Sequence, residues 1–152
     1  MKRTFTILAA LLTPACGNTV QPSPLYSSYF LTAVDGAPLP VRFTEDGSVL
    51  LAGSLTFPDG SRPRAPGPAD GLVSYTILVR RPDQTQEHST IELNYSIRDG
   101  VLRIDLCPPL ALCFASTELV GPILGPAEEL VLTHYLGGTP GSVYRYFPSL
   151  PD

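Results

Sequence analysis

Hydrophobic and polar residues alternate with a period of two from about residue 25 onward. The alternation is clearest over residues 90–98, where one face collects Ile91, Leu93, Tyr95 and Ile97. Residues 72–80 repeat the pattern, and in residues 48–57 it predicts an inner face made of Val49, Leu51, Leu55 and Phe57. A period of two is typical of strands that bury one face and expose the other.

Nine segments carry this pattern, and they cover residues 27–34, 40–43, 48–57, 72–80, 90–98, 101–106, 113–119, 129–136 and 142–147. Asp99-Gly100 lies between two of them and predicts a two-residue type I′ hairpin, in which both residues take positive φ. No segment has the pattern of a long amphipathic helix, although residues 108–113 can form a single turn. Eight or so consecutive strands must hide their edges, so we expect an all-β fold in which the sheet closes.

Short motifs along these strands resemble small bacterial lipocalin-like proteins, many of which are lipoproteins. The chain has YFLTAVDGAPLP at 29–40, GSLTF at 53–57 and VYRY at 143–146, in the order found in that family. The resemblance implies an up-and-down β-barrel over residues 25–150 and no assigned activity. A barrel of this size either fills with side chains or holds one small molecule. The residues that would line such a cavity are Tyr29, Phe57, Tyr75, Tyr95 and Phe114.

The N-terminus changes from apolar to polar at Cys16. Lys2 and Arg3 precede an eight-residue apolar run, which is too short to cross a bilayer as a helix and is typical of a secretory signal. The sequence LTPAC, residues 12–16, resembles the lipobox of bacterial lipoproteins, although Thr13 and Pro14 depart from it. The resemblance implies a signal peptide over 1–15 and lipid attachment at Cys16. Ordinary cleavage after residue 15, which would release a soluble secreted protein, is the alternative.

Residues 17–24, GNTVQPSP, follow this cysteine as a predicted tether. Eight residues extend at most about 25 Å, so the domain would lie close to the lipid surface. Gly17 replaces the aspartate that retains lipoproteins at the inner membrane of familiar two-membrane bacteria. Outer-membrane placement is the resulting expectation.

The composition limits the class of partner. The chain of 152 residues has room for one domain. The ten Lys and Arg include Lys2 and Arg3, so the mature part would carry eight against 14 Asp and Glu, a formal charge of −6. This balance disfavours nucleic acid or anionic lipid as a partner.

Two cysteines remain, Cys107 and Cys113, in CPPLALC. In an oxidising compartment, an even pair so close together predicts a disulfide. A metal site or a redox pair is the weaker alternative, because the spacing is not CxxC and the chain has two histidines.

Other candidate residues have ordinary structural explanations. His88 lies in a polar run that predicts a solvated loop, and His134 alternates with leucines, which predicts a hydrogen-bonded core histidine rather than a catalytic one. Glu128 and Glu129 are neighbours and would point to opposite faces of a strand, so they do not form a carboxylate pair. Residues 137–142, GGTPGS, predict a hairpin turn, and residues 58–71 predict a solvated loop with a short polyproline segment.

These features favour two functions. The first is a membrane-anchored envelope lipoprotein whose barrel is an interaction or structural module, with another envelope protein as partner. The second is a carrier that binds a small apolar ligand inside the barrel. We expect no enzymatic activity, cofactor or metal, because the sequence has no GxSxG or HExxH motif.

Overall fold

A computed structural model of the chain describes residues 28–42, 44–58, 69–109, 111–113, 115–123 and 129–149. Within these residues every regular element is a β-strand. The strands are β1 Ser28–Val34, β2 Ala37–Pro38, β3 Val41–Arg42, β4 Val49–Thr56, β5 Ala69–Arg80, β6 Gln86–Arg98, β7 Val101–Asp105, β8 Thr117–Pro122, β9 Leu130–Leu136 and β10 Thr139–Pro148.

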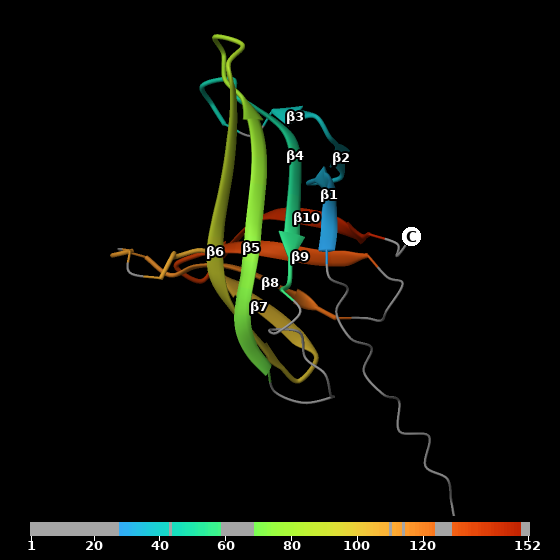
Figure 1. Ribbon diagram of the computed structural model, residues 1–152, viewed down its shortest axis with the longest axis vertical. Helices are drawn as coiled ribbons and strands as arrows, with labels where there is room; N and C mark the ends of the chain where they lie inside the picture. Colours follow the sequence, from blue (N-terminus) through green and yellow to red (C-terminus); the bar gives the residue numbers. More distant parts are fainter. Residues whose placement is uncertain are drawn as a thin grey trace, which may run out of the picture.

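The sheet closes into a barrel, as the sequence predicts. Strands β4 to β10 follow one another as antiparallel neighbours, and β1 pairs with both β10 and β4. The closing pairs include Tyr29 with Leu55 and Phe30 with Phe147. Eight strands form the barrel, while the short β2 and β3 are additions to it (Figure 1). The all-β, up-and-down barrel prediction is therefore confirmed.

Two-residue turns set the register of the hairpins. Asp99 and Gly100 have φ of 52° and 74°, and Arg98 pairs with Val101 across them. Gly137 and Gly138 have φ of 56° and 82° between β9 and β10. Positive φ at both central residues matches the right-handed twist of the flanking strands. Both predicted hairpins are thus confirmed.

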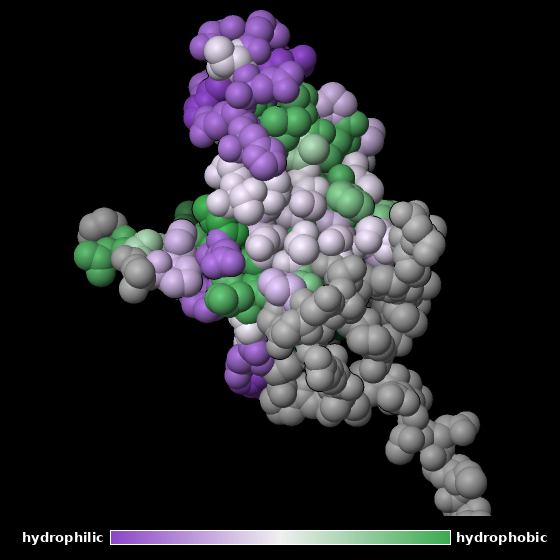
Figure 2. Space-filling model, viewed as in Figure 1, coloured by the Kyte–Doolittle hydropathy of each residue, from purple (hydrophilic) through white to green (hydrophobic). Residues whose placement is uncertain are grey.

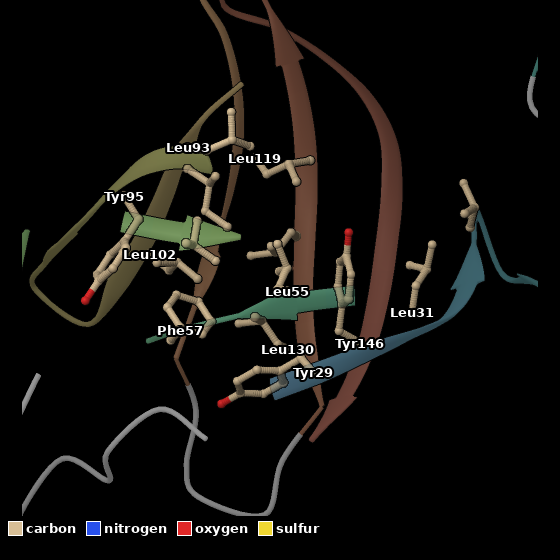
Figure 3. Packing of buried hydrophobic residues seen from close by; sticks show 14 of the residues in the cluster. Tyr29, Leu31, Leu55, Phe57, Leu93, Tyr95, Leu102, Leu119, Leu130 and Tyr146 are labelled. Carbon is tan, nitrogen blue, oxygen red and sulfur yellow. The ribbon is translucent and has the colours of Figure 1, made fainter. Parts of the chain in front are cut away.

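Most of the core lies inside one end of the barrel, where the N-terminus of β1 meets the end of β10, and the buried pair Leu50 and Val79 extends it toward the other end. Inward-facing side chains from all eight barrel strands fill this end, and among the largest that are fully buried are Leu55, Phe57, Leu93, Leu102, Ile104, Leu132 and Tyr146 (Figure 3). The alternation predicted for residues 90–98 is confirmed, since Leu93, Tyr95 and Ile97 are buried and Ile91 packs against them.

The predicted inner face of β4 is partly wrong. Leu50, rather than Leu51, is buried, and Ser48 is only 2% exposed. The register between β4 and β5 shifts between Leu50 and Ala52. This irregularity inserts one residue and reverses which side chains point inward on its two sides. The alternation holds from Gly53 onward and fails before it.

Strand limits also differ from the prediction. Strand β6 begins at Gln86, so His88 lies in a strand and not in a loop. Strand β8 covers residues 117–122 instead of 113–119, and β2 was not predicted. The start of β6 is polar on both faces, which removes the alternation that would identify it as a strand.

The predicted signal peptide, Cys16 and the tether lie outside the described residues. Across the ranges that the structure does describe, no helix is both long and apolar enough to span a membrane.

Candidate functional site at the open end of the barrel

Three of the five predicted cavity residues fill the packed end instead of lining a space. Tyr29, Phe57 and Tyr95 are at most 3% exposed. The ring centroids of Tyr29 and Phe57 lie 6.1 Å apart, and those of Phe57 and Tyr95 lie 5.2 Å apart, both edge to face. This is the favourable geometry for packed aromatic rings. Phe114 lies outside the described residues.

The fifth residue, Tyr75, belongs to a tyrosine cluster with Tyr144 and Tyr146. Burial, followed by the neighbouring Tyr144, raises the pKa of Tyr75 to about 12, and an interaction with Tyr146 partly offsets this. Burial raises the pKa of Tyr146 well above its usual value, and burial together with Asp35 raises that of Tyr144. All three phenols are therefore neutral at physiological pH.

The Tyr146 hydroxyl is buried without a hydrogen bond of normal geometry among the described residues. The Tyr75 phenol is close enough to influence the ionisation of the Tyr146 hydroxyl, yet it does not form a hydrogen bond of normal geometry with that hydroxyl. In Figure 3 this hydroxyl points away from the Tyr29 and Phe57 rings. A buried, unsatisfied hydroxyl is costly, so this position is unusual within the core.

The interior is less tightly filled from Tyr75 and Tyr144 toward the open end. Tyr75, Ile77, Ile91 and Tyr144 face inward but are only half-buried. A small cavity of about 160 Å³ opens there, with Ile77 and Val79 beneath a polar rim. The rim consists of Thr44, Asp46, Ser48, Arg81, Glu87 and Ser89.

Hydrogen bonds fix the rim. The Thr44 hydroxyl and the Ser48 amide donate to Asp46, the latter at 2.8 Å, and together they lower the pKa of Asp46 to about 2. Arg81 donates to Glu87 with Nε and Oε2 2.9 Å apart. Asp46 is thus ionised and a weak base at neutral pH, and the arginine is already paired, so the rim is suited to binding polar groups and not to proton transfer.

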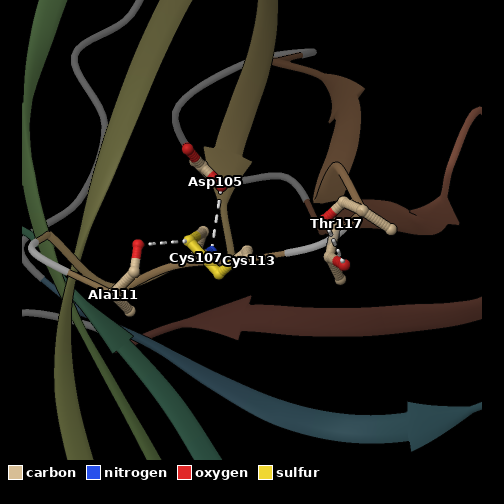
Figure 4. The surroundings of a disulfide bond; sticks show 6 residues. Asp105, Cys107, Ala111, Cys113 and Thr117 are labelled. Carbon is tan, nitrogen blue, oxygen red and sulfur yellow. Dashed lines mark hydrogen bonds between the residues drawn. A yellow bond between two sulfur atoms is a disulfide. The ribbon is translucent and has the colours of Figure 1, made fainter.

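The predicted disulfide is present. Cys107 and Cys113 are bonded, with Cα atoms 6.0 Å apart. The Cys107 amide donates to Asp105 at 2.9 Å, which fixes the start of the loop (Figure 4). Ala111 donates to the Pro108 carbonyl at 3.0 Å, consistent with the predicted turn. Leu112 is 94% exposed on this stapled loop.

A second concavity lies on the outer surface of β5 to β8, with a volume of about 630 Å³. Three of its four charged lining residues, Asp70, Arg103 and Glu118, are ion-paired, and the fourth, Asp105, accepts a hydrogen bond from the Cys107 amide. Arg98 donates to both oxygens of Asp70 at 2.8–2.9 Å, and Arg103 donates to Glu118 at 3.2 Å. The groove is polar and open to solvent, and none of these ions is left to attract a charged ligand strongly.

The surface is otherwise divided by hydropathy. Figure 2 shows a hydrophilic tip where β5 and β6 join, and apolar side chains nearer the middle of the molecule. On the outside of β1 and β10, Phe30 and Phe147 are paired across the strands and are 54% and 50% exposed.

The remaining candidates do not come together. His88 is exposed on β6, whereas His134 is half-buried on β9. Glu129 accepts a hydrogen bond from Arg145 at 2.7 Å, and Glu128 and residues 59–68 lie outside the described part. Among the residues that are described, no three His, Cys, Asp or Glu side chains are grouped so that they could hold a metal ion.

Comparisons with family models, with curated proteins and with solved structures each found no match.

Sequence reasoning missed Tyr144 and Tyr146, which complete the tyrosine cluster. The signal was available, because the same period of two that places Tyr146 inside the barrel also places Tyr144 there. The rim residues had no such signal, since they come from a loop and from the polar ends of β5 and β6.

Proposed function

We propose that this chain is an envelope lipoprotein, attached to a membrane by lipid at Cys16, whose barrel serves as an interaction or structural module. The observation that carries the proposal is the Cys107–Cys113 disulfide. Structural disulfides form and persist in oxidising, extracytoplasmic compartments. This supports an exported chain independently of the sequence before Cys16.

The position of the first strand is compatible with such an anchor. Strand β1 begins at Ser28, twelve residues after Cys16, and an extended segment of that length reaches at most about 40 Å. The packed end of the barrel, where β1 begins, would therefore face the membrane. The open end, with its polar rim and the disulfide-closed loop, would face away from the membrane.

Exposed apolar groups support an interaction role. Leu112 projects from a loop that the disulfide holds, and Phe30 and Phe147 form an exposed pair on the outer surface. Adjacent exposed apolar side chains, such as the Phe30 and Phe147 pair, are common at sites of protein contact.

The anchor is tested by replacing Cys16. The full chain is expressed in a bacterium that processes lipoproteins, alongside Cys16→Ser and a Cys107→Ser/Cys113→Ser control. We expect the native chain and the control to incorporate labelled fatty acid and to float with membranes, and Cys16→Ser to lose both properties. A native chain that is exported but remains unlabelled and soluble would overturn the anchor.

The second candidate is a carrier for a small apolar ligand, and one observation favours it. The unsatisfied Tyr146 hydroxyl lies beside inward-facing side chains that are only half-buried. The cavity at the rim, about 160 Å³, is smaller than the roughly 300 Å³ from which ligand pockets usually begin, so we prefer the module. Native mass spectrometry of the purified protein distinguishes the two, because a carrier would retain a bound molecule.

A further inference from the structure

Strand β6 is much longer than its contact with β7. It pairs with β5 along its whole length, from Ile97 opposite Ala69 to Gln86 opposite Arg80. Its pairing with β7 covers only Tyr95–Arg98. In the part of the chain that the structure describes, the nine residues Gln86–Asn94 have no strand along their second edge.

This edge is regular and open. The β5–β6 register has no irregularity over Gln86–Asn94, and the stretch contains neither proline nor lysine, which commonly protect sheet edges. Figure 1 shows no other strand beside the upper half of β6 on the side away from β5. Ile91, on the edge strand itself, is half-buried, so an added strand would cover more of its surface.

The stretch is complementary to itself. We propose that Gln86–Asn94 pairs antiparallel with the same residues of a second copy, about a two-fold axis at Thr90, and joins two barrels through one continuous sheet. Full overlap of the nine residues places Thr90 opposite its own copy. His88 then lies opposite the partner's Glu92, and Gln86 lies opposite the partner's Asn94.

The side chains favour this register over its neighbours. His88 and Glu92 are both exposed on the outer face of β6, and symmetry forms the His88–Glu92 pair twice. The His88 ring can donate a hydrogen bond to the partner's Glu92 carboxylate across the strands. Like charges directly opposite each other, by contrast, destabilise a sheet. Moving the two-fold axis to Ser89 or Ile91 places His88 and the partner's Glu92 out of register. A parallel, in-register arrangement places the Glu92 side chains of the two copies side by side.

An isologous contact of this kind closes as a dimer and does not propagate. One pair of nine-residue strands is small beside the roughly 1,200–2,000 Å² of a standard stable interface. We therefore expect a dimer that exchanges, which is best detected by trapping it. The proposal does not depend on the lipid anchor, because it uses only residues of the barrel.

The test uses the full chain with a cysteine at position 90. Paired Cβ atoms directly opposite each other lie about 4.5–5.5 Å apart, within reach of a short bis-maleimide. Thr76→Cys is the matched control. Thr76 is hydrogen-bonded to Thr90 at 2.9 Å from the neighbouring strand, so both variants lose the same bond. The two copies of position 76 would be about 15 Å apart, three strand spacings.

We expect Thr90→Cys to yield a cross-linked dimer and Thr76→Cys to yield several-fold less. Adding His88→Glu to Thr90→Cys places two carboxylates opposite each other and should reduce the yield several-fold. Adding Glu92→Lys as well creates an opposite-charge pair at the two positions and should restore the yield.

Peptide mapping confirms that the Cys107–Cys113 bond is intact in every variant, and circular dichroism confirms the fold. No dimer from folded Thr90→Cys, equal yields at positions 76 and 90, or no response to the charge variants would each overturn the proposal.

Discussion

The two ends of the barrel interior are built differently. At the packed end, Tyr29, Phe57 and Tyr95 interlock edge to face, and β1 closes the barrel between β10 and β4. At the open end, Tyr75 and Ile77 are half-buried, and β6 extends beyond its pairing with β7. The contrast implies that the packed end supplies most of the folding free energy. The residues of the open end contribute less to stability and are available to bind a partner. Five predictions test this division.

The largest expected effect is at Phe57, which is 1% exposed and touches both tyrosine rings of the packed end. Phe57→Ala removes the central ring and leaves a cavity, so we expect a loss of about 3–5 kcal/mol in the free energy of unfolding. Urea unfolding followed by circular dichroism measures it. A loss below about 1 kcal/mol would mean that the aromatic cluster is not central to stability.

Two isoleucines compare the ends directly. Ile104 is fully buried, whereas Ile77 is half-buried at the open end. Ile104→Ala should cost about 2–5 kcal/mol, and Ile77→Ala about half as much or less, because less apolar surface is lost. The same urea experiment on both variants checks the ratio. Equal losses would contradict the division of the interior into packed and open ends.

The sequence predicted the fold correctly where a single local rule, such as alternation or turn type, determines the position of each residue. Over residues 90–98 a buried face and a solvated face alternate without interruption, and the two-residue turns at Asp99 and Gly137 fix the register. Closure of the barrel followed from the number of strands and the need to hide edges. These are local or general constraints, and one sequence is sufficient to express them.

The prediction failed where contacts between segments distant in sequence determine the local structure. The irregularity at Leu50 depends on how β4 lies against β5, and it has no turn residue to mark it. The polar start of β6 shows no alternation because the edge beside it is open. The rim and the unsatisfied Tyr146 hydroxyl exist only because strands distant in sequence meet. The anchor at Cys16 lies outside the described residues and remains a prediction.

Alkaline pH tests the tyrosine cluster, which extends from the boundary between the two ends into the open end. Burial raises the pKa of Tyr75 to about 12, while the unfolded chain ionises near 10. The stabilisation is fully present below pH 10 and is lost as the pH rises from about 10 to 12, because the unfolded state releases its proton first. Tyr75 alone should account for a loss of about 2–3 kcal/mol. Phenolate absorbance should show Tyr75, Tyr144 and Tyr146 ionising late, and a single transition of all seven tyrosines at pH 10 in the folded protein would contradict it.

Two glycines compare close backbone contacts at the two ends. A Cβ at Gly121, opposite Leu102 in the packed end, would lie 1.9 Å from the Val131 carbonyl oxygen, so the backbone must move. At Gly53, opposite Ile77, the nearest atom is a Leu31 methyl carbon at 3.0 Å, which a side-chain shift can relieve. We expect Gly121→Ala to cost about 1–3 kcal/mol and Gly53→Ala less. Thermal unfolding of both variants decides the order, and the reverse order would mean that the β8–β9 contact is looser than described.

The smallest effect is expected at Tyr146, on the boundary between the two ends. Its hydroxyl is buried and unsatisfied, so Tyr146→Phe removes a polar group that gains nothing from the folded state. Folding should be unchanged or stabilised by up to about 1 kcal/mol. Tyr75→Phe is the control, since its hydroxyl lies in the more open half. A loss of more than about 1 kcal/mol in Tyr146→Phe but not in Tyr75→Phe would show that bound water or a ligand, and not the Tyr75 hydroxyl, satisfies the Tyr146 hydroxyl. That result would favour the carrier, in which the open end leads to a ligand cavity, over the interaction module.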